Sequence, residues 1–169
     1  LNISIFSHSM GTLVSRNYLK KYEKHIEKIV LCGPPTENIL VDVALFVGKL
    51  TGSFYEEHKP NKILNKLSVG YYNKGYKTEN EWICSNLETV SSYNNDPLCG
   101  FTFTTSGFMN LFQLLKSAFI KEDWNPQNSS LPIFLIAGVD DPVIQGKEKF
   151  NELEEFLKEV GYENIKSNL

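Results

Sequence analysis

Three features are scarce in this chain, and each scarcity argues against a class of protein. Its three cysteines are widely spaced and form no C-x-x-C pair, which argues against a disulfide framework or a zinc site. No apolar run approaches the roughly 18 residues that cross a bilayer, so we expect no transmembrane segment. Arginine is rare, since 16 of the 17 basic residues are lysine, and no basic stripe is present. We therefore expect no nucleic-acid partner.

The same scarcities bear on compartment and cofactors. Free thiols suit a reducing environment, so we expect a cytoplasmic protein. The carboxylates are spread along helical faces without metal-ligand spacing, and nothing in the sequence calls for a metal or an organic cofactor. The oligomeric state cannot be derived from the sequence.

The length of 169 residues and the mixed surface charge, with a net charge of -3, suit one globular domain with a sizeable core. Apolar runs alternate with helical spacing at both ends of the chain, which predicts parallel strands joined by helices. Strands are predicted at 2–6, 27–32 and 131–137, with short strand-like patterns at 101–104 and from 162 onward. Helices are predicted at 10–22, 39–50, 62–67, 79–92, 106–119 and 146–160.

These elements predict an α/β fold with a parallel sheet and flanking helices. The segment of about 36–125 interrupts the strand–helix rhythm with mostly helical, aromatic-rich sequence. We interpret it as an insertion within one domain, because no linker separates it from the rest of the chain.

The first eleven residues carry the strongest chemical signal. An apolar run ends at Ser7, Ser9 and Gly11 follow at alternate positions, and a helical pattern then begins. This is the layout of a nucleophile elbow, in which a serine stands on a strained turn between strand and helix. Ser9 is the candidate nucleophile, and the backbone N–H of Met10 is a candidate oxyanion-hole donor. We expect small flanking residues to be needed because the turn brings strand and helix close together.

A candidate acid follows the strand predicted at 131–137. Asp141 lies on a loop at the carboxyl end of that strand, and Pro142 keeps its backbone extended. Its carboxylate would orient a histidine base. Asp140 is the alternative.

None of the three histidines fits the base. His8 lies inside the elbow, and its side chain is expected to point away from Ser9. His25 ends a charged helix, and His58 lies in a polar stretch of the insertion. Because the expected order is Ser, Asp, His, the base is expected beyond Leu169.

These motifs resemble those of the α/β-hydrolases, specifically the monoacylglycerol lipase, lysophospholipase and serine aminopeptidase (S33) group. Ser7–Gly11 resembles the G-H-S-M-G of that group, and Gly138–Val143 resembles its G-x-x-D-P-V acid loop. The stretches at 68–74 and 96–103, with Trp82, are similar to the cap of members described as lysophospholipases.

The resemblance implies a partial α/β-hydrolase fold with a helical cap. Residues 1–169 would be the C-terminal part of one such domain, with the upstream strands, an upstream oxyanion loop and the last-strand region lying outside the chain. It implies a serine hydrolase whose full-length parent is active, whereas the isolated chain is expected to be inactive.

The expected substrate is a carboxylic ester of a lipid, acylglycerol or lysophospholipid. Phe101, Phe103 and Tyr71 are candidate pocket residues, although ordinary packing would also account for any single aromatic. Two alternatives stay open: amide hydrolysis by an S33-type aminopeptidase, and an inactive remnant that serves as a binding domain. A haloperoxidase or acyltransferase activity on the same fold is a further option.

Overall fold

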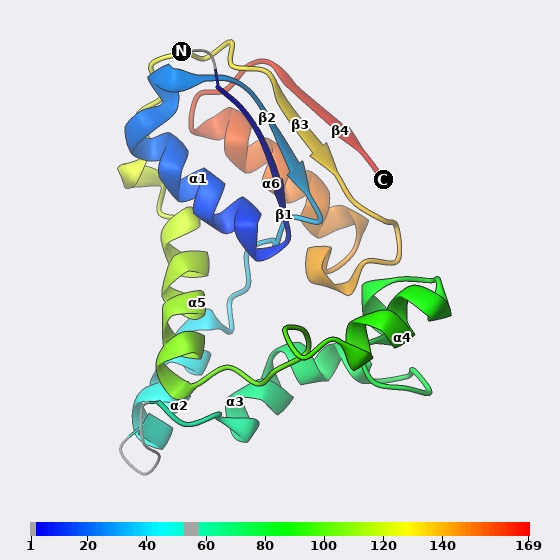
Figure 1. Ribbon diagram of the computed structural model, residues 1–169. Coiled ribbons are helices and arrows are strands. Elements are labelled where there is room, and N and C mark those ends of the chain that lie inside the picture. The colour runs from blue at the N-terminus through cyan, green and yellow to red at the C-terminus, as the bar shows by residue number, and fades with distance from the viewer. Residues whose placement is uncertain (1–2, 53–57) are drawn as a thin grey trace. The chain divides into compact units, whose positions relative to one another are not determined.

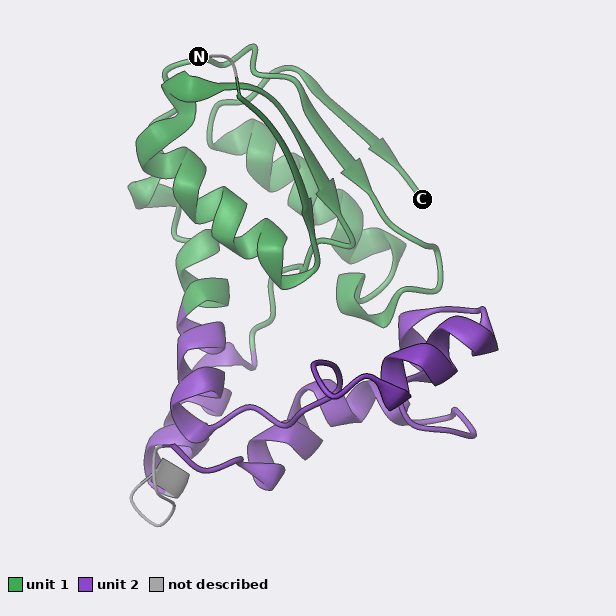
Figure 2. Ribbon diagram, in the orientation of Figure 1, with its two compact units in different colours: residues 1–39, 114–169 green, residues 40–113 purple. Residues whose placement is uncertain are grey.

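The structure is a computed structural model that describes residues 3–52 and 58–169. It divides into two compact units, residues 1–39 with 114–169 and residues 40–113 (Figure 2). The second unit lies within the segment predicted as an insertion.

Figure 1 labels the helices and strands. The strands are β1 (Ile3–His8), β2 (Ile26–Cys32), β3 (Ile133–Ile136) and β4 (Ile165–Asn168), and the helices are α1 (Met10–Tyr22), α2 (Val41–Gly52), α3 (Lys62–Leu67), α4 (Leu87–Asn95), α5 (Thr105–Ala118) and α6 (Lys147–Glu159).

The first unit contains a parallel sheet with strand order β1-β2-β3-β4. The register aligns the carboxyl ends of its strands, because His8 pairs with Cys32 and Cys32 pairs with Ile136. Loops that leave β1, β2 and β3 therefore begin along one edge of the sheet, where open parallel sheets place their sites. This arrangement confirms the predicted parallel α/β architecture.

Helices α1 and α6 cover the same face of this sheet (Figure 1). The apolar spacing of α6 puts Phe150, Leu153 and Leu157 into the core, where they join Ile29 of β2 and Leu19 of α1. Amphipathic helices on a parallel sheet are stabilised mainly by this burial.

The other face of the sheet carries a second apolar row. Phe6, Val30 and Phe134 stand beside one another in the register of β1, β2 and β3. The Phe6 side chain is 71% exposed, and the other two residues are half-buried.

The second unit packs around a small core in which Leu64 of α3 contacts Phe108 and Phe112 of α5. Asn61 caps α3, since its side-chain oxygen accepts hydrogen bonds from the N–H groups of Ile63 and Leu64.

Most predicted elements are confirmed to within two residues, and α1 and α3 match at both ends. Residue 2 of the first predicted strand lies outside the described residues. The helix predicted at 79–92 is wrong. A short 3-10 turn at Glu81–Ile83 is followed by an extended Cys84, and α4 begins only after Asn86. The side chain of Asn86 accepts hydrogen bonds from the first-turn N–H groups and so starts a new helix.

The strand-like pattern at 101–104 does not form a strand. A single antiparallel bridge joins Thr104 to Pro60, and the rest of the segment is irregular. Alternation over four residues is too short to specify pairing without a partner strand.

Candidate active site

Ser9 occupies a strained position between β1 and α1. Its backbone has φ 50° and ψ -123°, a conformation that residues with a Cβ rarely adopt. The turn is held by the sheet, since the Ser9 N–H donates to the Cys32 carbonyl at 2.9 Å. Local strain of this kind persists only where the surrounding structure enforces it.

The hydroxyl of Ser9 is not used to cap the helix. Ser9 stands at the N-cap position of α1, yet its side chain makes no capping hydrogen bond. The Thr12 hydroxyl and the Thr12 N–H instead donate to the Ser9 carbonyl, at 2.8 and 2.9 Å. The half-buried Ser9 side chain thus keeps its hydroxyl available beside the first turn of α1. Met10 opens that helix, and its N–H is among the first-turn donors that lack an intrahelical acceptor.

Small residues flank the turn on both sides. Ser7 is buried, and its hydroxyl donates to the Val30 carbonyl at 3.2 Å. A Cβ built on Gly11 would lie 3.8 Å from the Ser7 Cβ, which is ordinary van der Waals contact. A methyl group therefore fits at position 11, and Ser7 and Gly11 are both small, as expected for the flanks of this turn.

Asp141 lies at the same edge of the sheet, after β3. Its backbone is extended, with φ -66° and ψ 112°, as the following proline predicts. One carboxylate oxygen, Oδ1, accepts from the Val143 N–H at 2.9 Å and caps the short turn Pro142–Ile144. Asp140 is exposed on the preceding turn.

Gly33, the first residue after β2, lies between these two loops. Its φ is +53°, and a Cβ there would come within 3.0 Å of Asp141 Oδ2 and 3.6 Å of His8 Nε2. The glycine therefore makes room for both side chains. The neighbouring Cys32 thiol has its pKa raised, first by burial and then by the negative charge of Asp141.

No described histidine completes a triad with these groups. Among the described residues, none of the three histidines hydrogen-bonds to Ser9. His8 is exposed and its Nε2 faces Gly33, whereas His25 and His58 are exposed on other segments. The described residues also contain no group of three or more His, Cys, Asp or Glu side chains that could hold a metal ion.

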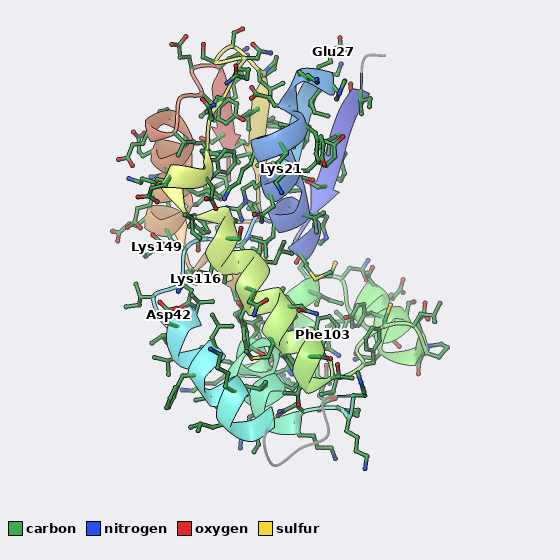
Figure 3. All side chains as sticks on the ribbon, turned by 90° about the vertical axis from the view of Figure 1, so that its left-hand side faces the viewer. Lys21, Glu27, Asp42, Phe103, Lys116 and Lys149 are labelled. Atoms are coloured by element: carbon green, nitrogen blue, oxygen red, sulfur yellow. The ribbon has the colours of Figure 1, made fainter. Side chains whose placement is uncertain are left out.

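The candidate pocket residues all belong to the second unit. Phe103, which precedes α5 (Figure 3), packs on Phe108 with ring centroids 5.5 Å apart. Phe101 lies on Phe103 at 5.6 Å and is 64% exposed, and Tyr71 is 62% exposed. Phe103 thus has a packing role within this unit, whereas the other two rings are largely free of contacts that would bury them.

Sequence reasoning missed two residues near the site, Gly33 and Arg16. Gly33 directly follows the strand predicted at 27–32, and nothing in the local pattern links it to Asp141. Arg16 of α1 is fully buried, and burial lowers its pKa to about 9. The sequence did contain a signal. Arg16 is the only arginine in the chain, and it lies three residues from both Leu13 and Leu19, on the apolar side of the predicted helix.

Comparison with solved structures shows the fold class. The chain is similar to a thermostable carboxyl esterase from Bacillus coagulans crystallised with glycerol, with a TM-score of 0.83 and 24% identity over 99% of this chain and 56% of that one. It is similar to the monoacylglycerol lipase of Paleococcus ferrophilus, with a TM-score of 0.64 and 16% identity over 98% and 57%. A soluble variant of the Saccharomyces cerevisiae monoglyceride lipase, bound to a substrate analog, matches with a TM-score of 0.65 and 14% identity over 100% and 52%. These matches define a partial α/β-hydrolase fold, and the chain spans little more than half the length of each of these proteins.

The family follows from the sequence itself. Residues 1–168 match the family described as serine aminopeptidase, S33, and the chain belongs to that family. A search of curated proteins finds no match. Within residues 3–52 and 58–169, no helix combines the length and the hydropathy that crossing a bilayer requires.

Proposed function

We propose that this chain carries the nucleophile and the acid of a serine hydrolase that cleaves a carboxylic ester through an acyl-enzyme on Ser9. The observation that carries the proposal is the backbone of Ser9, strained between β1 and α1 with its hydroxyl left out of capping. Asp141 follows β3 at the same sheet edge, in the chain order that α/β-hydrolases use.

The proposed reaction has two halves. Ser9 Oγ attacks the ester carbonyl carbon and gives its proton to a histidine base, while the Met10 N–H stabilises the oxyanion. The C–O bond to the alcohol breaks, and the alcohol leaves with that proton. Water then attacks the acyl-enzyme, gives its proton to the same histidine, and the acid is released as Ser9 recovers its proton. Asp141 orients the imidazole and stabilises its cation. The histidine itself is expected beyond Leu169 in the full-length protein.

The proposed substrate is a lipid ester of the acylglycerol or lysophospholipid type. Support comes from solved relatives that are esterases and monoacylglycerol lipases, and from two exposed rings of the second unit, Tyr71 and Phe101, of which Phe101 lies on Phe103. A cytoplasmic location is part of the proposal, supported by three free cysteines among the described residues.

Amide hydrolysis is the second candidate, and the family description favours it. The same triad serves both reactions, so the leaving group must be tested directly. An acyl-p-nitrophenyl ester series of varied chain length, set against aminoacyl-p-nitroanilides on the full-length protein, separates the two.

Labelling by a fluorophosphonate tests the nucleophile. We expect stoichiometric labelling of Ser9 in the full-length protein and none in Ser9→Ala.

Asp141→Asn should lower kcat by about 10³–10⁴-fold, whereas Asp140→Asn should change it little. The isolated 169-residue chain should show no burst of ester cleavage and little labelling. Equal labelling of wild type and Ser9→Ala would refute the assignment, and an unreactive full-length protein would favour a binding remnant.

A further inference from the structure

Arg16 of α1 is a fully buried cation. No part of its side chain is accessible, and no described carboxylate forms an ion pair with it. Its Nε donates to the Thr12 carbonyl at 3.3 Å, and its Nη2 donates to the Pro35 carbonyl at 2.7 Å. The guanidinium carbon lies 4.8 Å from the centroid of the Phe119 ring, and Nη1 has no hydrogen-bond partner among the described residues. Since burying a charge is costly, an apolar residue would fill this position at lower cost if packing alone mattered.

Through Thr12, Arg16 is connected to the turn at Ser9. Thr12, whose carbonyl accepts from Arg16, donates its hydroxyl to the Ser9 carbonyl at 2.8 Å. The guanidinium is thus two hydrogen bonds away from the backbone of Ser9.

Through Pro35 and Thr36, Arg16 is also connected to the loop that carries Asp141. Pro35 precedes the buried Thr36, whose hydroxyl donates to the Ile144 carbonyl at 3.1 Å. The Gln145 amide in turn donates to the Thr36 hydroxyl at 2.9 Å. Ile144 is fully buried in the turn that Asp141 caps, so Thr36 ties the backbone after β2 to the loop that presents the carboxylate.

We propose that Arg16 is a positioning residue that holds the acid loop, residues 138–145, in register with the Ser9 turn through Pro35 and Thr36. The inference rests on the proposed function for the roles of Ser9 and Asp141. A planar guanidinium suits this task because it directs two N–H groups at fixed angles toward carbonyls on two separate segments. A lysine would offer one flexible point charge instead.

Hydrogen exchange on the full-length protein tests the positioning without requiring activity. The variants are Arg16→Met, Arg16→Lys and Thr36→Val, of which the last cuts the link to Ile144 and leaves α1 intact. Lys20→Met is the matched control, because Lys20 lies one turn further along α1, over Trp124 and near Asp123, without touching the loops at 33–36 or 138–145. We expect amide exchange to quicken at least several-fold in 138–145 for Arg16→Met and Thr36→Val, less for Arg16→Lys, and not at all there for Lys20→Met.

The full-length enzyme supplies the second readout. Arg16→Met should lower kcat by about 10–100-fold with KM within about twofold of wild type, since a shift of the acid on the order of 1 Å spoils the chemistry but not binding. Arg16→Lys should recover part of kcat. If Arg16→Met does not fold, Thr36→Val carries the test.

The outcomes separate the two ideas. Unchanged exchange in 138–145 for folded Arg16→Met and Thr36→Val overturns the positioning role, as does uniform quickening throughout the sheet, which indicates plain destabilisation. If exchange responds as expected but wild type shows no Ser9-dependent hydrolysis, the proposed function fails while the structural link stands.

Discussion

At the scale of single residues, the backbone of Ser9 differs from the other strained positions. Among the described residues, three non-glycine residues have positive φ, and two of them, Asn80 and Gln145, lie in the ordinary left-handed region. Ser9 does not, because its ψ of -123° takes it outside that region. Strain at a site with an uncommitted hydroxyl is what a nucleophile elbow requires.

Substitutions of Gly33 and Gly11 test which of these two positions near the site requires a glycine. Gly33→Ala should destabilise the chain by about 1–2 kcal/mol, because a Cβ is disfavoured at φ +53° and would press on the Asp141 carboxylate. Gly11→Ala should be neutral or stabilising by up to about 1 kcal/mol, since it lies in a helix with room for a methyl group. Urea unfolding of both variants measures the difference, and equal stabilities would contradict the crowding at Gly33.

At the scale of elements, two helices of the second unit, α3 and α4, both begin with an asparagine N-cap, one buried and one exposed. Asn61 and Asn86 each accept hydrogen bonds from two first-turn N–H groups. Asn61 is fully buried and also donates to the Thr105 hydroxyl at 3.0 Å, whereas Asn86 is exposed to solvent. Burial removes water as a substitute partner, so the same cap contributes more to stability at Asn61.

This difference predicts unequal costs for the same substitution. Asn61→Ala should lower the free energy of unfolding by about 2–3 kcal/mol, and Asn86→Ala by about 0.5–1 kcal/mol. Far-UV circular dichroism during urea titration measures both. A larger loss at Asn86 than at Asn61 would show that burial does not set the strength of these caps.

At the scale of the whole molecule, the sheet of the first unit has two unlike faces. One is covered by α1 and α6, and the other presents the row of Phe6, Val30 and Phe134. Strands of a parallel sheet are ordinarily buried on both faces. An apolar row that the described residues leave exposed, on a neutral strand such as β1, favours association between molecules.

We therefore expect the 169-residue chain to self-associate in solution. Phe6→Lys should shift its mass toward the 19.3 kDa monomer, because it places a charge at the β1 end of the row, on its most exposed side chain. Phe101→Lys is the control, since that ring is similarly exposed but lies in the second unit. Light scattering coupled to size exclusion measures the mass, and a monomeric wild type over the accessible concentrations would contradict the expectation.

Prediction from the sequence succeeded where the signal is local. The spacing of apolar residues correctly predicted α1, α3 and α6, because a 3.6-residue period can be recognised from residues that are close together in the sequence. It failed at Asn86, where one side-chain cap outweighed a continuous helical pattern.

The sequence by itself determined most of the elements, their order and the extended backbone of Asp141, because each depends on residues within a few positions. It also marked the turn at Ser9, whose strained backbone is held by the hydrogen bond to Cys32 of β2. Tertiary structure alone decided that Gly33 faces Asp141 and that Arg16 bonds to Pro35. These two contacts join residues that are 108 and 19 positions apart, and their geometry depends on the path of the chain through the parallel sheet. No local pattern encodes that path.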